Sequence, residues 1–262
     1  MSRCVVLLMF FFNIAFSSEL RMLYEKNYET PQSAYEIKLV NHVKNSFEKA
    51  LKLQSNLTGQ IFQETADSIQ WRKQTLPHYY FLTNIVNIPY YHLLNNLCNF
   101  SNASHAHVGL LAGDSFIAAL YQNEHLLKQI IAIDWFQECP LQIFNGNCQN
   151  FIQMNCFETI NGSCFNIDKT LFSMPIDIYF YDADHSLKGQ EMALTYYNDL
   201  FADVFVAVID DCNCPWIRGA TFKAFDKLQY SILYENIIPA TDGDRGGQYV
   251  AVIKKNKNLG NP

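Results

Sequence analysis

The chain has 262 residues, which is enough for one full α/β domain with an N-terminal addition. Hydrophobic residues make up 49% of it and charged residues 17%, a composition that excludes an intrinsically disordered protein. The net charge is −6 and no long Lys/Arg run occurs, which argues against a surface that follows nucleic-acid phosphates, so we expect no nucleic-acid partner.

Residues 1–18 have the pattern of a secretory signal peptide. Arg3 precedes an apolar run over residues 5–16, and Ser17 and Ser18 follow it. The run is too short for a comfortable membrane helix, so we expect no stable membrane span in the mature chain. A buried N-terminal helix is the alternative. The protein is therefore expected to be exported if the signal is real and cytoplasmic otherwise.

Residues 19–91 are predicted to form a helical N-terminal extension. Apolar side chains recur close to a 3.6-residue period at Tyr35, Leu39, Val43 and Phe47, which is typical of one buried helix face. After a break at residues 56–59 the helical pattern resumes over residues 61–71, and a short helix is expected from Tyr90 to Leu97. We interpret the extension as a helical cap, or as an arm through which the chain forms a homo-oligomer.

Strand and helix patterns alternate over residues 92–256, and residues 257–262 form a tail. Strands are expected at 106–111, 130–133, 151–157, 176–181 and 204–209, and helices at 116–122, 187–200 and 216–228. A loop-rich stretch is expected around residues 144–148. Two late strands, 230–238 and 249–253, have no convincing helix between them and should pair antiparallel. The pattern predicts an α/β fold with a doubly wound, Rossmann-like, mostly parallel sheet of about seven strands whose last strand is antiparallel.

Two signals near the first strands are typical of a nucleotide-type site. Gly109 and Gly113, followed by Ser115, occupy the predicted turn from the first strand to its helix, where glycine lets the backbone approach a ligand. Asp134 ends the next strand, where an acid commonly binds ribose hydroxyls. A tight turn and a helix cap are the plain alternatives, but the two signals together are more specific than either alone.

Two later strands end in acids. Asp182, Asp184 and His185 follow one strand, and Asp210 and Asp211 follow the next. Clustered carboxylates persist when they share a cation or a proton, and oxygen ligands suit Mg²⁺, Ca²⁺ or Mn²⁺. His185 lies three residues after Asp182, within reach as a general base. Alternatively, Asp184 and one of the later acids only cap the helices that follow.

In this order, these motifs resemble the class I S-adenosylmethionine-dependent methyltransferases, and most closely a bacterial branch with acidic strand ends of this type. The resemblance covers roughly residues 92–255. It implies O-methylation of a small-molecule or sugar hydroxyl, with S-adenosylmethionine as cofactor and Mg²⁺ assistance. The implied metal ligands are Asp182, Asp210 and Asp211, and the implied base is His185. The implied cofactor contacts are His107, Gly109, Gly113, Ser115, Asp134, Ser163, Cys164 and Asp182.

The sequence departs from this family at several positions. The family has an acid two residues before the first glycine, which helps to place the positively charged methionine end of the cofactor; this chain has His107 there. Ser163 stands where an acid is expected near the adenine, and Ala183 replaces a glycine. A second hypothesis is therefore an exported, non-catalytic binding protein on the same fold. A third is a metal-dependent hydrolase, which would leave the glycine turn and Asp134 without a role.

Overall fold

The structure is a computed structural model that describes residues 26–57, 88–238 and 247–256. The predicted signal peptide, the predicted helical segment around residues 61–71 and the tail at 257–262 lie outside the described residues. Within the described ranges, no helix combines the length and the apolar character needed to cross a membrane.

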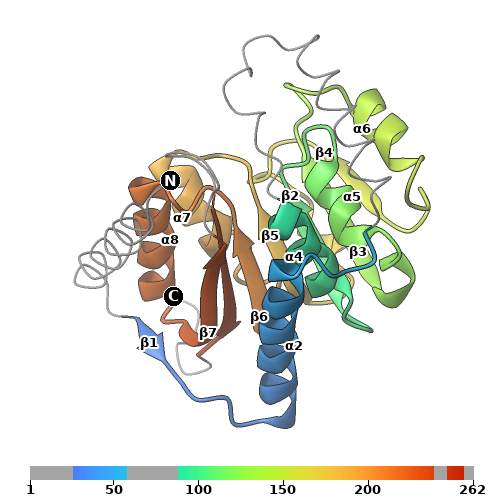
Figure 1. Ribbon diagram of the computed structural model, residues 1–262. Helices are drawn as coiled ribbons and strands as arrows, with labels where there is room; N and C mark the ends of the chain where they lie inside the picture. The colour runs from blue at the N-terminus through green and yellow to red at the C-terminus, as the bar shows by residue number, and fades with distance from the viewer. Residues whose placement is uncertain (1–25, 58–87, 239–246, 257–262) are drawn as a thin grey trace, which may run out of the picture.

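A single twisted sheet forms the centre of the molecule (Figure 1). Its order is β1-β7-β8-β6-β5-β2-β3-β4. The strands are β1 (Asn27–Tyr28), β2 (Ser104–Val108), β3 (Gln129–Asp134), β4 (Glu158–Asn161), β5 (Ile176–Tyr181), β6 (Phe201–Ile209), β7 (Ser231–Ile238) and β8 (Gln248–Lys254). All neighbours pair in parallel except β8, which is antiparallel to both β6 and β7. The predicted antiparallel last strand is confirmed.

Helices cover both faces of the sheet, as expected for a doubly wound fold (Figure 1). One face carries α2 (Ala34–Leu51), α4 (Ile88–Cys98), α5 (Asp114–Leu120) and α6 (Leu141–Cys148), and the other carries α7 (Leu187–Thr195) and α8 (Pro215–Lys227). Strand alternation divides the core between the faces. On β5, for example, Ile178 and Phe180 pack on the α4 side, while Tyr179 and Tyr181 pack on the α7 side.

Three sequence expectations are corrected by the structure. The sheet has eight strands rather than seven, because the two-residue β1 pairs with the edge strand β7. The expected strand at 151–157 is a series of turns, and β4 follows it instead. The stretch read as a loop around Asn145-Gly146-Asn147 is helix α6, whose Phe144 and Cys148 are spaced one turn apart and are both buried. Burial of that face outweighs the turn preference of Asn-Gly.

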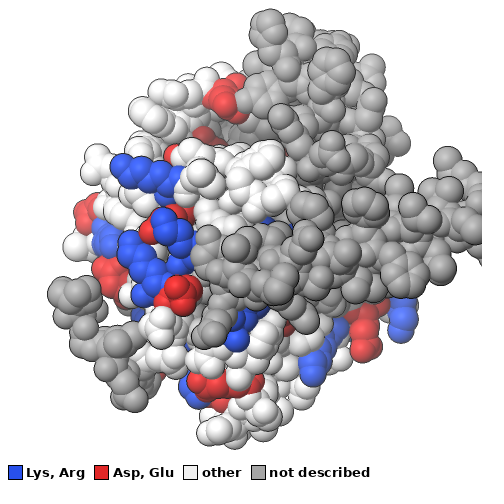
Figure 2. Space-filling view, turned by 90° about the vertical axis from the view of Figure 1, so that its left-hand side faces the viewer, with Lys and Arg blue, Asp and Glu red and all other residues white. Residues whose placement is uncertain are grey.

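The N-terminal segment is joined to the far edge of the sheet by paired charges. Lys26 Nζ lies 2.8 Å from Glu235 Oε2 and 3.9 Å from the centre of the Phe222 ring. Lys254 Nζ lies 3.2 Å from Glu29 Oε2 and 3.4 Å from Glu36 Oε1. Basic and acidic side chains lie next to one another on the described part of this side of the molecule (Figure 2). The segment is therefore an integral part of the sheet's edge.

The start of α2 is fixed by a capping box. The Ser33 hydroxyl accepts a hydrogen bond from the Glu36 N–H at 3.1 Å, and Glu36 Oε2 accepts one from the Ser33 N–H at 3.2 Å. We expect Ser33→Ala to lower the free energy of unfolding by about 1 kcal/mol, measured by urea denaturation. Ser101→Ala, on an exposed loop, is the control and should change it by less than about 0.5 kcal/mol. Equal effects would contradict the capping role.

Candidate active site

The predicted site residues gather at one edge of the sheet, because parallel strands that are neighbours end on the same side. β2 ends before Gly109, β3 ends at Asp134, β5 ends before Asp182, and β6 ends before Asp210. The Asp182 N–H donates to the Val108 carbonyl at 2.8 Å, and the Asp210 N–H donates to the Tyr181 carbonyl at 3.1 Å. The carboxyl ends of β2, β5 and β6 are thus held side by side.

The loop from Gly109 to Gly113, called the glycine loop below, requires glycine at both of these positions. Gly109 has φ +87°, and a Cβ there would lie 1.7 Å from the Asp182 carbonyl oxygen. Gly113 has φ +99°, and a Cβ there would lie 3.1 Å from the Phe144 ring. Only glycine adopts these backbone angles without strain. The close passage of Gly109 against Asp182 brings the loop directly against the acidic strand end.

The Asp134 carboxylate points towards the glycine loop and is hydrogen-bonded to its backbone. Its Oδ2 accepts hydrogen bonds from the N–H groups of Leu110 at 2.6 Å and Leu111 at 3.0 Å, and its Oδ1 accepts one from Phe136 at 2.7 Å. The predicted role was ribose binding. In the structure the carboxylate fixes the shape of the loop, and only its remaining lone pairs are open to a ligand.

The turn after β4 lies beside Asp134. The Gly162 N–H donates to the Asp134 carbonyl at 3.0 Å, so Ser163 and Cys164 stand at the same edge of the sheet. Both side chains are half-buried. The Cys164 carbonyl accepts a hydrogen bond from the Tyr197 hydroxyl at 2.6 Å, and burial raises the pKa of its thiol to about 11, which keeps it protonated at neutral pH.

His107 is completely buried beneath the glycine loop. Its Nδ1 lies 3.2 Å from His105 Nε2, and its Nε2 lies 3.0 Å from Ser115 Oγ. Burial lowers the pKa of His105 to about 4, and burial together with the charge of His105 lowers the pKa of His107 well below its usual value. Both rings are neutral at physiological pH. The position that carries an acid in the family is uncharged here.

These buried histidines predict acid sensitivity. A histidine with a depressed pKa stabilises the fold above its unfolded-state pKa of about 6.5, and this stabilisation is lost as pH falls towards the folded value. For His105, whose folded-state pKa is about 4, the loss amounts to about 3 kcal/mol. We expect His105→Gln to flatten the decline in unfolding free energy between about pH 6.5 and 4 in urea titrations. His125→Gln, at an exposed site, should leave the decline unchanged.

The acidic strand ends form a cluster around His185. His185 Nε2 lies 3.1 Å from Asp182 Oδ1 and 3.9 Å from Asp211 Oδ2. The hydrogen bond to Asp182 is the main cause of a pKa of about 9 for His185, so the ring is protonated at neutral pH before any ligand binds. Its Nδ1 is buried and has no hydrogen-bond partner among the described residues. That nitrogen can take a proton once the ring is neutral.

Asp210 directly follows β6 and is half-buried. Burial, followed by the charges of Asp182 and Asp211, raises its pKa well above the usual value. Its Oδ1 accepts hydrogen bonds from Gln248 Nε2 and from the Asp211 N–H, both at 2.8 Å. Asp211 has φ +55°, in the left-handed region that few non-glycine residues adopt.

Asp184 supports the start of α7, although it is not the N-cap residue itself. Ser186 is the N-cap of α7, and its own N–H donates to Asp184 Oδ1 at 2.9 Å. The N-cap of α8 is Cys214, whose side chain makes no capping bond. Asp184 therefore supports the turn, while Asp182, Asp210 and Asp211 face the cluster.

The predicted metal site is not formed in this arrangement. Among the described residues, no group of three or more His, Cys, Asp and Glu side chains is placed to hold a metal ion. His185, which carries the positive charge near Asp182 and Asp211, is one physical reason. The arrangement as it stands does not fit a divalent cation.

Two residues at this site were missed by the sequence analysis. Gln248 is 5% exposed and holds Asp210. The Tyr90 ring packs against Phe180 at 6.3 Å between centroids, and burial followed by the charges of Asp210 and Asp182 raises the pKa of its hydroxyl. Strand alternation places Gln248 on the face of Val250 and Val252, which offered a signal for it. Nothing in the local sequence around Tyr90 distinguishes it from a core aromatic residue.

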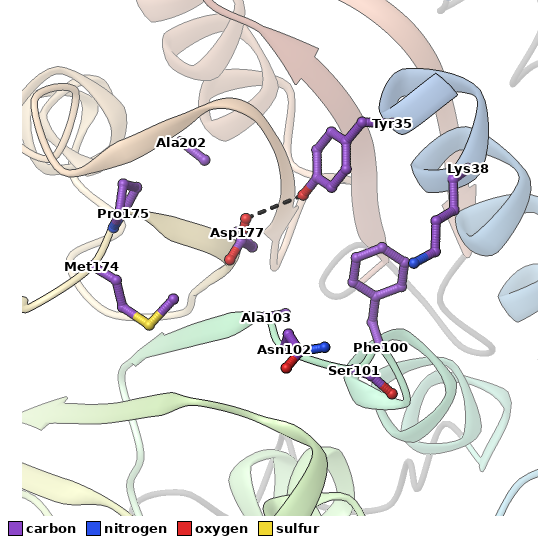
Figure 3. Close-up of a pocket in the computed structure, with 10 residues that line it drawn as sticks. All are labelled: Tyr35, Lys38, Phe100, Ser101, Asn102, Ala103, Met174, Pro175, Asp177 and Ala202. Atoms are coloured by element: carbon purple, nitrogen blue, oxygen red, sulfur yellow. Dashed lines mark hydrogen bonds between the residues drawn. The ribbon is translucent and has the colours of Figure 1, made fainter. Parts of the chain in front are cut away.

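The pocket shown in Figure 3 lies at the other end of the strands from the candidate active site. It has a volume of about 420 Å³ and lies at the amino ends of β2, β5 and β6. The Tyr35 hydroxyl points across it and donates to Asp177 Oδ1 at 3.2 Å (Figure 3). It includes none of the predicted site residues.

Comparisons with known proteins support the fold. No family model matches the sequence, and no curated protein matches it. An O-methyltransferase from Bacillus cereus, solved with S-adenosylhomocysteine, has a TM-score of 0.53 at 14% identity, covering 75% of this chain and 92% of that one. The O-methyltransferase TomG from Streptomyces achromogenes, solved with S-adenosylmethionine, has a TM-score of 0.53 at 15% identity, covering 77% and 92%.

An N-methyltransferase is similar to the same extent. NodS from Bradyrhizobium japonicum, solved with S-adenosylhomocysteine, has a TM-score of 0.52 at 9% identity, covering 72% of this chain and 97% of that one. The similarity therefore extends over nearly the whole length of each of these enzymes and over about three quarters of this chain. The chain has the fold of the class I S-adenosylmethionine-dependent methyltransferases.

Proposed function

We propose that this protein transfers a methyl group from S-adenosylmethionine to a hydroxyl group of a small molecule or sugar. The observation that carries the proposal is the passage of Gly109 against the Asp182 carbonyl. It puts the glycine loop, the half of the site suited to the cofactor, directly beside His185 and the acids. A donor and an acceptor bound in these halves would be adjacent, and holding two reactants in the right geometry can supply a large part of a rate enhancement.

The chemistry proposed for the chain's own residues is proton removal by the pair of Asp182 and His185. The ring must first lose the proton that it carries at neutral pH; its Nε2–H then still donates to Asp182 Oδ1, which leaves Nδ1 as the proton acceptor. As the acceptor oxygen forms its bond to the methyl carbon, the bond from that carbon to the sulfonium sulfur breaks. The hydroxyl proton moves to Nδ1, and S-adenosylhomocysteine leaves.

Divalent-metal assistance is supported only by the resemblance of Asp182, Asp210 and Asp211 to the family's acids. A bound Mg²⁺ would lower the pKa of the acceptor hydroxyl. Since the acids do not fit a cation as they stand, no step is assigned to the metal. Comparison of turnover in Mg²⁺ and in a chelator tests this part, and equal rates would remove the metal from the proposal.

The proposal is tested first by binding. Calorimetric titration of the full chain with S-adenosylhomocysteine should give heat, and incubation with S-adenosylmethionine and a panel of hydroxylated compounds should release S-adenosylhomocysteine. If titration with S-adenosylhomocysteine and titration with S-adenosylmethionine both give no heat, the enzyme assignment is overturned. Binding of the cofactor without turnover of any compound would favour a non-catalytic binding protein on the same fold.

A non-catalytic binding protein on the same fold is the second candidate. It is favoured by the neutral, buried His107 at the position of the family's acid, and by the signal-like N-terminus, since S-adenosylmethionine is made and held in the cytosol. Mass spectrometry of the mature N-terminus distinguishes an exported protein from a cytosolic one. Cleavage after about residue 18 supports export, and an intact Met1 contradicts it.

A further inference from the structure

The pocket of Figure 3 has opposite charges on two of its sides. Of the residues that line it, only Lys38 and Asp177 are charged. The Asp177 carboxylate lies on one side, and the Lys38 side chain lies on the other, against the Phe100 ring (Figure 3). The volume of about 420 Å³ is within the range of small-molecule sites, which combine an apolar lining with a few polar groups. Much of the remaining lining is apolar and comes from Ala103, Met174, Pro175 and Ala202.

The Asp177 carboxylate is fixed at the amino end of β5. Its Oδ1 accepts a hydrogen bond from the Tyr35 hydroxyl at 3.2 Å, and its Oδ2 accepts one from the Ser104 N–H at 2.9 Å. Burial, followed by the charge of Asp177, raises the pKa of Tyr35, so this hydroxyl remains a donor at neutral pH. Each carboxylate oxygen has two lone pairs, so Oδ1 keeps one for a ligand.

The Lys38 ammonium has no carboxylate partner within the described parts of the chain. Its Nζ lies 4.8 Å from the centre of the Phe100 ring, and a cation over an aromatic face is stabilised by the electrons of the ring. Phe100 is itself buried and contacts the His42 ring at 4.7 Å between centroids. The ammonium is therefore held at the pocket wall, and its N–H donors are open to an anion.

A ligand that carries both charges suits this pocket better than a ligand that carries one. A carboxylate alone would be attracted to Lys38 and repelled by Asp177, and an ammonium alone would meet the reverse. A zwitterion places its ammonium at Asp177 and its carboxylate at Lys38. A methylene chain between the two charged groups would then lie against the apolar lining.

We propose that this pocket binds a small organic zwitterion, with an ammonium at one end, a carboxylate at the other and an apolar chain between them. The pocket is separate from the candidate active site, because it lies at the amino ends of β2, β5 and β6. Tyr35 and Lys38 belong to α2 and Asp177 belongs to β5, so a bound zwitterion would also connect the N-terminal helix to the sheet.

Three probes of similar length test the requirement for both charges. 6-Aminohexanoate carries the ammonium and the carboxylate, hexylamine carries only the ammonium, and hexanoate carries only the carboxylate. Titration of the full chain followed by NMR gives their dissociation constants, at low ionic strength because salt screens exposed charges. We expect 6-aminohexanoate to bind about tenfold or more tightly than either of the others, as one additional charged hydrogen bond provides.

Replacement of Lys38 by methionine removes the charge and keeps most of the side chain. In Lys38→Met, 6-aminohexanoate should lose its advantage over hexylamine, while hexylamine binds at least as tightly as it does to the unaltered protein. Lys44→Met is the matched control, because Lys44 also lies on α2, with its Nζ 5.4 Å from the centre of the Tyr234 ring, but does not line the pocket. It should change none of the three constants.

Two further variants test the other end of the ligand. In Asp177→Asn, 6-aminohexanoate should lose its advantage over hexanoate. Since Asp177 also accepts a hydrogen bond from Ser104, retained binding of hexanoate shows that this variant is folded. Tyr35→Phe leaves the charge of Asp177 in place and frees its Oδ1, so 6-aminohexanoate should bind at least as tightly as before.

Several outcomes would overturn the inference. Equal binding of hexanoate and 6-aminohexanoate would make the pocket a simple anion site, and equal binding of hexylamine would make it a cation site. An unchanged advantage in both Lys38→Met and Asp177→Asn would place the zwitterion elsewhere on the protein. If none of the three probes binds, the pocket has no such ligand. Binding of S-adenosylhomocysteine is a separate result, because it tests the proposed function and not this pocket.

Discussion

Replacement of Gly109 by alanine should abolish cofactor binding and destabilise the whole domain. The new Cβ would lie 1.7 Å from the Asp182 carbonyl oxygen, and the residue would have to keep φ +87°. The obstacle is backbone directly after β5, which is hydrogen-bonded to the Val108 carbonyl and cannot give way as a side-chain end can. We expect the free energy of unfolding to fall by about 3–5 kcal/mol in urea denaturation.

A matched control is available on α8. Gly219 lies within that helix, and a Cβ there would meet nothing within 4 Å. Gly219→Ala should leave cofactor binding unchanged and raise the free energy of unfolding by about 0.5–1 kcal/mol, since alanine is the better helix former. A Gly109→Ala protein as stable as the unaltered one would show that β2 and β5 do not pass as closely as described.

Replacement of His185 by glutamine should remove turnover while cofactor binding remains. Glutamine is similar in length and keeps a hydrogen bond to Asp182, but it cannot take up a proton. We expect the rate of methyl transfer to fall by about 10²–10⁴, the usual contribution of a general base. The dissociation constant of S-adenosylhomocysteine should change little, because His185 lies on the acceptor side.

The control for this change is His125→Gln, at an exposed position on a short helical turn. It should affect neither the rate nor the binding. A His185→Gln protein that keeps most of its activity would assign the proton to another group or to solvent. Loss of S-adenosylhomocysteine binding as well would mean that the acidic cluster also shapes the cofactor half of the site.

The sequence predicts the architecture well because periodicity reports burial directly. Strands such as β5 and β6 read as continuous apolar runs, since both faces of a parallel strand are covered by helices. The exceptions are short elements. α6 contains Asn-Gly, which favours turns, and it is helical because Phe144 packs against Phe116 at 5.5 Å. β1 has only two residues, too few for any pattern.

The sequence alone also determined which acids and glycines meet at one edge of the sheet. Strand ends follow from the order of elements, so Gly109, Asp134, Asp182 and Asp210 could be placed there without a structure. The choice of glycine at 109 and 113 is explained by positive φ angles, and His107 is recognisable as a departure from an acid by its spacing to Gly109.

Only the tertiary structure decided what these side chains do. A carboxylate can turn towards a ligand or towards a backbone N–H, and Asp134 is bound to the loop because Leu110 and Leu111 present their amides to it. Tyr90 and Gln248 join the site from positions far apart in the chain, and their contacts with Phe180 and Asp210 depend on the tertiary packing. The approach of His185 to Asp211 likewise depends on the pairing of β5 with β6, which brings the ends of these two strands together.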